Sequence, residues 1–352
     1  MAPPARPTPH RLLALALLAA PLGGCYLLDS ARGQLALNRE RVPIATLVAS
    51  PATPEPLRAK LELIERMRDF ASRELGLPDN ASYRSYADIG RPYVVWNVFA
   101  APEFSVAPAT WCFPVAGCVA YRGYFTEAKA RRFALTLEAR GYDVAVEGVP
   151  AYSTLGHFAD PVLSTMLDWD EADLAGLLFH ELAHQLLYVK GDTAFNEAFA
   201  NVVEEEGVRR WLAAEGQSAA LAGFESRAAR FERVVALLAG ARARLARLYA
   251  EPLPPPEMRR RKEAELDALR AAYRAERATL GGGYDRLFGA SLNNATLASI
   301  AAYHDCAPGF RAELAAVDGD LARFYAAAAA LARRPPAERH AKLCGSPAAP
   351  GG

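Results

Sequence analysis

The sequence predicts an α+β fold that is mostly α, with a small sheet lobe ahead of a central helical pair and a helical C-terminal part. Three patterns predict it. Residues 93–99 and 142–146 are rich in β-branched and aromatic residues, which favour strands. Residues 174–187 form an apolar run with the length of a buried helix. Beyond Trp211 the chain is rich in Ala, Arg, Glu and Leu, which are good helix formers.

The N-terminus has the features of an export signal. Arg6 and Arg11 precede an apolar run, residues 12–22, which is too short for an ordinary membrane span. The run ends in Gly23-Gly24-Cys25, which resembles the lipobox of bacterial lipoproteins. We therefore expect residues 1–24 to be a lipoprotein signal peptide. An ordinary signal peptide with an incidental cysteine is the alternative.

That resemblance also implies where the chain is located. Cys25 would carry lipid and anchor the protein to a membrane surface, with the chain facing the periplasm of the bacterial envelope. Tyr26, rather than Asp, follows the cysteine, which favours the outer over the inner membrane by resemblance to Gram-negative lipoproteins.

The composition indicates a globular chain. The sequence is 52% hydrophobic and has no net formal charge, which argues against a nucleic-acid partner. An exported chain favours disulfides among the remaining cysteines, which are Cys112, Cys118, Cys306 and Cys344. Cys112 and Cys118 bracket a turn-forming segment, and the other two could then pair. Three connectivities remain open.

The other elements follow from their local patterns. Residues 26 to about 80 are expected to be helical, and residues 127–140 form a helix that ends at Gly141. Residues 218–250 and 256–279 predict a helical hairpin with charged outer faces.

The end of the chain is expected to contain a flexible joint, a helical region and a loose tail. Residues 281–283 are three glycines, residues 293–332 are helical in pattern, and the chain after Pro335 is rich in Pro, Gly and Ala. Within the hairpin, the arginines at 259–261 are expected to be a solvated face; contact with anionic lipid is the alternative.

His180-Glu181-Leu182-Ala183-His184 is the most informative segment. Residues i and i+4 of a helix share a face, so His180 and His184 can bind one metal ion. Glu181 lies beside them, where it can act as general base for an attacking water. A catalytic zinc site needs a third protein ligand.

Glu197 is the expected third ligand. The first helix should run out near Tyr188, and a second should start at Thr193, with Asp192 or Thr193 as its N-cap. His184 and Glu197 lie at similar distances from this break. If the two helices pack antiparallel, Glu197 comes level with His184. The expected cofactor is therefore Zn²⁺.

Residues that could orient the histidines lie further along the second helix. Glu204 follows Glu197 by two helical turns, and Asn201 follows it by one; either could bind the second ring nitrogen of a histidine. A solvated acidic run, Glu204 to Glu206, is the alternative.

The segments HELAHQ at 180–185 and NEAFA at 196–200, with Glu204 after them, resemble the gluzincin metallopeptidases, and above all the zinc aminopeptidases. Most of the chain resembles a bacterial family of aminopeptidase-like proteins, many of them lipoproteins; residues 31–35, 121–125, 152–156 and 292–295 carry that likeness. The loop between the two helices is shorter than in the zinc aminopeptidases. Their Gly-x-Met-Glu-Asn motif has no counterpart, because the nearest segment, residues 148–152, lacks the carboxylate.

The resemblance implies a gluzincin-like domain over residues 25–352. It would comprise N-terminal helices and the sheet lobe (26–155), the zinc-site helices (156–215), and the helical arm with the C-terminal helices (216–352). An edge strand that binds extended peptide would include Tyr152, Ser153 and Thr154, although an ordinary turn between strands is equally compatible.

The resemblance also suggests where the remaining catalytic groups lie. Tyr303 or His304 would stabilise the oxyanion, while a core tyrosine and a surface histidine are the alternatives. His157 could line the cleft, or it could be an ordinary loop histidine.

The sequence thus predicts hydrolysis of peptide substrates with Glu181 as base, most simply by an aminopeptidase. An endopeptidase is one alternative. A lipid-anchored envelope scaffold that retains the fold is another, although the intact Glu181 favours an enzyme.

Overall fold

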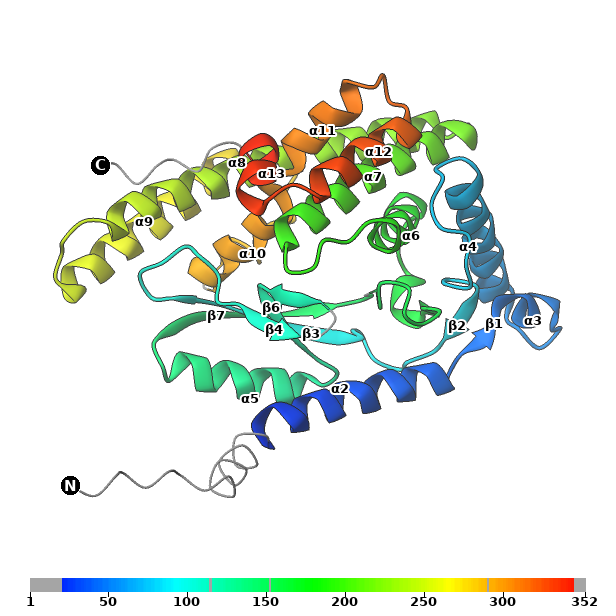
Figure 1. Cartoon of the computed structure of the whole chain (residues 1–352), viewed down its shortest axis with the longest axis horizontal. Helices are drawn as coiled ribbons and strands as arrows, with labels where there is room; N and C mark the ends of the chain where they lie inside the picture. The colour runs from blue at the N-terminus through cyan, green and yellow to red at the C-terminus, as the bar shows by residue number, and fades with distance from the viewer. Residues whose placement is uncertain (1–20, 114–115, 152, 290, 345–352) are drawn as a thin grey trace, which may run out of the picture.

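The computed structural model describes residues 21–113, 116–151, 153–289 and 291–344. It is a mixed α+β structure in which helices predominate, as expected from the sequence. The sheet lies at one side of a large helical body, and the first described helix runs along the outside of the lobe (Figure 1). Most of the predicted signal peptide, residues 1–20, lies outside the described part of the chain.

The main sheet has three antiparallel strands in the order β6-β3-β7. Their bounds are β3 (Val95–Pro102), β6 (Tyr121–Tyr124) and β7 (Tyr142–Val149). A smaller sheet joins β1 (Val42–Pro43), β2 (Ser85–Ala87) and β8 (Val162–Leu163), and a hairpin joins β4 (Trp111–Phe113) to β5 (Gly117–Val119). The two predicted strand segments are confirmed in β3 and β7.

The two faces of the main sheet have different partners. Trp96, Val98 and Ala100 of β3 pack against helix α5 (Glu127–Glu138), which ends before Gly141 in the left-handed conformation. The opposite face carries Val95, Asn97 and their cross-strand neighbours, and helix α10 (Asn294–His304) packs over part of it. This second face is the one that meets the functional site.

The N-terminal region contains helices and one short strand. The helices are α2 (Pro21–Arg39), α3 (Ile44–Ala49) and α4 (Glu55–Arg73). Strand β1 interrupts the stretch that the sequence predicts to be helical, because residues 42 and 43 pair with β2. Helix α4 buries Leu61, Ile64 and Met67 in the main core.

Helices α6 (Glu171–Leu186) and α7 (Thr193–Ala214) pack antiparallel at the centre of the main core. Figure 1 shows both inside the helical body, on the side that faces the sheet. The ring of Phe179 lies where a side chain at Gly207 would stand, at 2.6 Å from its Cβ position. Glycine at 207 therefore lets the two helices approach closely.

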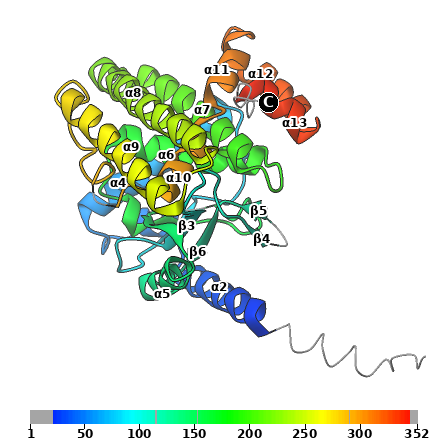
Figure 2. The same cartoon turned by 90° about the vertical axis from the view of Figure 1, so that its left-hand side faces the viewer.

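The predicted helical hairpin is present as α8 (Ser218–Tyr249) and α9 (Pro255–Glu276), which have a small core of their own. Figure 2 shows the pair side by side. Buried Lys262 fastens the hairpin to the sheet through an ion pair with Asp143 at 2.6 Å. Arg259 pairs with Glu103, and Arg261 with Glu251, so carboxylates offset much of the charge of the arginine run. This pairing favours the interpretation of residues 259–261 as a solvated face over a contact with anionic lipid.

The C-terminal part consists of α10, α11 (Ala307–Ala315), α12 (Leu321–Ala332) and α13 (Pro336–Leu343). The tail that the sequence predicts to be loose is therefore ordered as far as Cys344. A disulfide joins Cys306 to Cys344, and buried Leu343 packs in the main core. A second disulfide, Cys112–Cys118, closes the β4–β5 hairpin.

The prediction of an edge strand at residues 152–155 is wrong for residues 153–155, which the structure describes. Ser153 and Thr154 have no strand pairing, and Leu155 has a positive φ of 57°, which an extended strand does not adopt. Tyr152 lies outside the described residues. Within the described ranges, no helix is both long enough and apolar enough to cross a bilayer.

Candidate metal centre

Helix α6 presents the two histidines and the glutamate between them. Asp170 caps its first turn by accepting a hydrogen bond from the amide of Asp173, and the helix runs from Glu171 to Leu186. His184 and Glu181 are buried, and the side chain of His180 is 13% exposed. The helix places the imidazoles of His180 and His184 one turn apart on the face that looks toward α7.

A short loop then turns the chain into α7. Asp192 caps α7 by accepting from the amide of Phe195, as one of the two expected caps. The buried side chain of Asn196 closes the loop: its amide donates to the carbonyl of Val189 at 2.9 Å and its oxygen accepts from the amide of Val189 at 2.7 Å. Glu197, the next residue, is thereby brought opposite α6.

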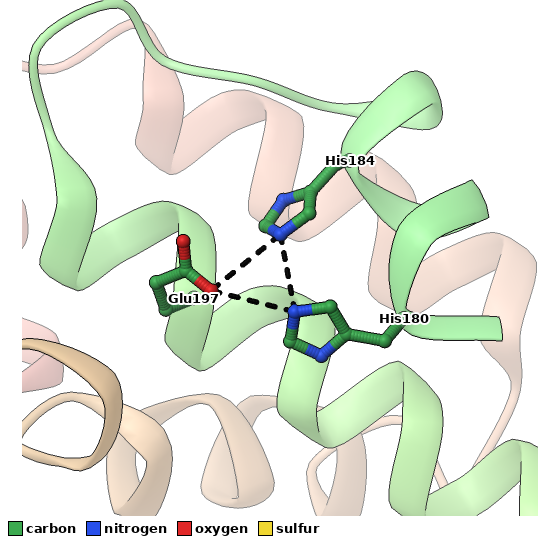
Figure 3. A group of neighbouring side chains, drawn as sticks. All are labelled: His180, His184 and Glu197. Atoms are coloured by element: carbon green, nitrogen blue, oxygen red, sulfur yellow. Dashed lines mark hydrogen bonds and ion pairs between the residues drawn. The ribbon is translucent and has the colours of Figure 1, made fainter. Parts of the chain in front are cut away.

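The three proposed ligands meet at one point (Figure 3). Nε2 of His180 and Nε2 of His184 are 3.1 Å apart. Oε2 of Glu197 lies 3.4 Å from the first nitrogen and 3.5 Å from the second. Among the described residues, these three side chains are the group whose ligand atoms come together in this way.

The triangle fits a tetrahedral metal ion. Ligand atoms about 2.0–2.1 Å from a tetrahedral zinc are roughly 3.3 Å from one another. The three measured separations lie on both sides of this value. Two imidazoles and one carboxylate are also a donor set that catalytic zinc sites use, with one position left open. The residues present therefore fit zinc.

Glu204 orients one of the ligands. Its Oε2 accepts a hydrogen bond from Nδ1 of His180 at 3.0 Å, so Nε2 of that ring is left for the metal. Gly176 makes room for this carboxylate, because a Cβ there would lie 3.1 Å from Oε1 of Glu204. Nδ1 of His184 is buried and has no hydrogen-bond partner among the described residues.

The other polar residues of this helix have different partners. The amide of Asn201 donates to the carbonyl of Tyr303 at 2.8 Å, so this side chain holds α10 instead of orienting a histidine. Glu205 binds Arg311, and Glu206 binds Arg210. The acidic run is thus divided: Glu204 faces the candidate metal site, while the other two form ion pairs away from it.

The electrostatics of the site favour a cation. Burial would raise the pKa of Glu197, but the charge and hydrogen bonds of the two imidazoles lower it to about 2. Burial would lower the pKa of His180, but hydrogen bonds with Glu197 and Glu204 raise it well above its ordinary value. Two carboxylates therefore draw positive charge to the point where the imidazoles meet, the position in which a divalent ion would be held.

Glu181 points into the same space without joining the triangle. Burial, with Glu197 and Asp160 nearby, raises the pKa of its carboxyl above the ordinary value, although the two histidines oppose the shift. A carboxylate with a raised pKa is a stronger base. Glu181 is therefore suited to proton transfer next to the candidate metal.

These groups lie in the wall of a cleft of about 610 Å³ between the sheet lobe and the helices. Its wall contains residues of α2, β3, β6, α6, α7 and α10, among them Tyr26, Asn97, Tyr121, Leu177 and Tyr303. The segment after β7 also lines it, through Ala151, Ser153 and Leu155. Ser153 therefore reaches the cleft from an irregular segment. Thr154 and His157 are not among the lining residues; Thr154 donates its backbone amide to buried Asp160.

The two oxyanion candidates are separated. Tyr303 lines the cleft, and burial together with Glu197 raises the pKa of its phenol well above the ordinary value, so it stays a hydrogen-bond donor. His304 instead lines a second cavity of about 230 Å³, which shares Asp173 and Glu204 with the cleft, and its ring contacts Phe231. Burial lowers the pKa of His304. His304 is therefore not among the residues that line the cleft, since it follows Tyr303 by one position on α10 and points in another direction.

Sequence reasoning missed three residues on the sheet side. Tyr121 of β6 lines the cleft, and burial raises the pKa of its phenol, with a contribution from Glu197. Asn97 lies opposite both Gly123 and Glu147 in the strand register, which places Glu147 on the cleft-facing side of β7. Tyr121 lies in residues 121–125, one of the segments that resemble the family, and this resemblance could have identified it. The positions of Asn97 and Glu147 follow only from the strand register.

A family model described as "Putative aminopeptidase" matches residues 25–343. The chain belongs to this family. Membership in the putative aminopeptidase family supports a peptidase-like function. The matched range, residues 25–343, includes every residue of the site described above. No curated protein and no solved structure was found to match the chain significantly.

Proposed function

We propose that this protein is a zinc-dependent aminopeptidase of gluzincin type, with His180, His184 and Glu197 as zinc ligands and Glu181 as general base. The observation that carries the proposal is the triangle of two imidazole nitrogens and one carboxylate oxygen, with separations of 3.1, 3.4 and 3.5 Å. The family description supports the aminopeptidase assignment.

When bound, zinc lowers the pKa of a water molecule and polarises the carbonyl of the substrate. Glu181 takes a proton from the attacking water as the new carbon–oxygen bond forms, and passes it to the nitrogen of the amine as the carbon–nitrogen bond breaks. Glu204 keeps His180 in the tautomer whose Nε2 can serve as a ligand.

Tyr303 is the proposed donor to the developing oxyanion. Its phenol is buried in the cleft wall, and its raised pKa keeps the proton on the oxygen through the neutral pH range. Asn201 holds the backbone carbonyl of the same residue and so positions it from α7. Tyr121, across the cleft on β6, is a second buried phenol near Glu197 and Glu181.

An aminopeptidase also needs an anion for the ammonium group of its substrate. Glu147 is our candidate. It lies on the cleft-facing side of β7, two residues before Val149, which lines the cleft. Its carboxylate has a hydrogen bond of 3.4 Å to Ser299, and no ion pair to it is found among the described residues. Ser299 lies one helical turn before Tyr303, so Glu147 is on the same side of α10 as the proposed oxyanion donor.

Glu181→Gln tests the mechanism. The variant should keep zinc and fold but lose on the order of 10²- to 10⁴-fold in kcat, because an amide cannot accept the proton. His184→Ala is the comparison, since it should lose zinc as well. Elemental analysis and turnover are measured on both. Undiminished turnover by Glu181→Gln, or equal zinc in His184→Ala and the unsubstituted protein, contradicts the proposal.

A peptide panel separates this function from its alternatives. Peptides with a free amino terminus should be hydrolysed, and N-acetylated peptides of the same sequence should not. Cleavage of both indicates an endopeptidase. Binding of zinc without cleavage of either supports the scaffold alternative, in which the α8–α9 hairpin binds a partner.

The proposed location is the bacterial cell envelope, where a lipid at the N-terminus anchors the protein to a membrane, the outer one in preference to the inner. Cys25 would be lipidated after removal of residues 1–24, and the chain would face the periplasm. The two disulfides support an oxidising compartment.

A further inference from the structure

One face of helix α2 is exposed and combines leucine with arginine. We define the α2 stripe as the positions at helical spacing that share this face: Leu28, Ala31, Arg32, Leu35, Ala36 and Arg39. All six are exposed, with Leu28 at 60% and Leu35 at 54% of their full accessibility. Three of the five exposed large apolar side chains among the described residues fall within residues 28–42.

The opposite face of α2 belongs to the protein. At 3.6 residues per turn, Tyr26, Ser30 and Leu37 lie about half a turn away from Leu28 and Leu35. Leu37 is buried in the main core, and the hydroxyl of Tyr26 donates to the carbonyl of Gly123 in β6 at 2.9 Å. Tyr26 and Ser30 line the cleft of the candidate metal site. Helix α2 therefore lies between the cleft on one side and the exposed stripe on the other.

We propose that the α2 stripe lies on the surface of an anionic bilayer, and that α2 thereby holds the cleft about one helix diameter, roughly 10 Å, from the lipid headgroups. The proposal concerns the orientation of the protein on the membrane and does not depend on the peptidase mechanism. If the mechanism also holds, the substrates within reach are peptides displayed at a membrane surface.

Charge complementarity favours an anionic surface. Arg32 and Arg39 are the charged members of the stripe, and both are positive. Asp29 lies at its margin and is engaged by Lys129 of α5. Exposed leucines flanked by arginines on a helix are the pattern of interfacial helices that rest among headgroups. Cys25 stands three positions before Leu28 in the sequence, so the lipid proposed there would be attached close to the start of the stripe.

Two leucines and two arginines bind a membrane weakly by themselves. Each arginine near an anionic surface strengthens the contact roughly fivefold, so the pair contributes about 25-fold. This is too little for stable attachment but enough to select one orientation of a protein that is already held near the bilayer. The stripe is therefore proposed to orient the protein; the anchor is a separate matter.

The test uses the full protein, purified from membranes in detergent and reconstituted into vesicles. Leu28→Cys, Leu35→Cys and, as control, Ala326→Cys each receive a fluorescent thiol label, with the unsubstituted protein as blank. Ala326 is exposed and belongs to α12. Helix α12 lies on the far side of the molecule from α2 in both views (Figures 1 and 2). Quenching by brominated phosphatidylglycerol reports which labels touch the bilayer.

We expect strong quenching at 28 and 35 and little at 326. Adding Arg32→Gln and Arg39→Gln should lower the ratio of bilayer-facing to free orientations by roughly 25-fold, while Arg259→Gln with Arg261→Gln, a matched change in the hairpin, leaves it unchanged. Quenching that is equal at all three positions overturns the proposal. So does efficient cross-linking between cysteines at position 28 of two molecules, because a second copy of the chain would then cover the stripe.

Discussion

Glu204→Gln tests how the charge of Glu204 would affect metal affinity at the candidate site. The carboxylate accepts from Nδ1 of His180 at 3.0 Å, and it is 35% exposed. Glutamine can still accept this hydrogen bond but carries no charge, so His180 becomes a weaker ligand. Loss of such a partner costs on the order of 10- to 100-fold in metal affinity. Solvent screens the exposed carboxylate, so we expect the lower end, about tenfold or ~1.4 kcal/mol.

Glu206→Gln is the matched control. It makes the same chemical change on the same helix, but Glu206 pairs with Arg210 and does not contact a histidine. Each apo-protein is titrated with zinc in competition with a chromophoric chelator at fixed pH and ionic strength. Glu204→Ala, which also removes the acceptor, should fall further than Glu204→Gln.

The stability of the folded protein gives an independent measure of the predicted tenfold loss in zinc affinity. Zinc at about 100 times its Kd stabilises the folded state by about 2.7 kcal/mol. A tenfold weaker site at the same free zinc should retain about half of that stabilisation. Zinc binding by Glu204→Gln within about twofold of the Glu206→Gln control would refute the contribution of the Glu204 charge. The same result for Glu204→Ala would refute its orienting role.

Three further predictions concern other parts of the molecule. Glu147→Gln should reduce the preference for free-amine over N-acetylated peptides by roughly 10- to 100-fold, the value of a hydrogen bond to a charged group, mainly through KM; an unchanged preference removes Glu147 from the amine site. Cys306→Ser with Cys344→Ser opens a bridge between residues 38 apart and should lower the free energy of unfolding by about 2–4 kcal/mol, measured by denaturant titration; an unchanged midpoint would show that α13 is held without it. Cys25→Ser should release the protein from membranes or leave its precursor uncleaved, and fractionation like the unsubstituted protein would indicate a plain secretory signal.

The sequence was most informative where the site depends on local structure. His180 and His184 share a face because of helical spacing alone, and Glu197 follows one short loop with a recognisable cap at Asp192. Two consecutive antiparallel helices then determine the triangle. The approximate arrangement of these three side chains can therefore be predicted from local sequence alone.

Residues whose role depends on tertiary packing were harder to predict. Asn201 has the helical spacing to approach a histidine, but α10 docks against α7 and its Tyr303 carbonyl takes the amide. Tyr303 and His304 are adjacent in sequence, and only the rotation of α10 decides which one faces the cleft. Glu147 lies on the same side of the sheet as cleft-lining Asn97 because of the sheet register, which a single sequence does not show.

The loop between the ligand helices has consequences for the order in which the molecule can be assembled. Buried Asp192, which caps α7, is bound by Arg339 at 2.6 Å and by His340 at 2.8 Å, both in α13 near the end of the chain. Helix α13 is in turn tied by the Cys306–Cys344 bridge. The turn that sets Glu197 against the histidines thus reaches its final form only after nearly the whole polypeptide has been made and its last cysteine oxidised. A metal ion held by the proposed ligands would then be loaded late, in the compartment where that bridge forms.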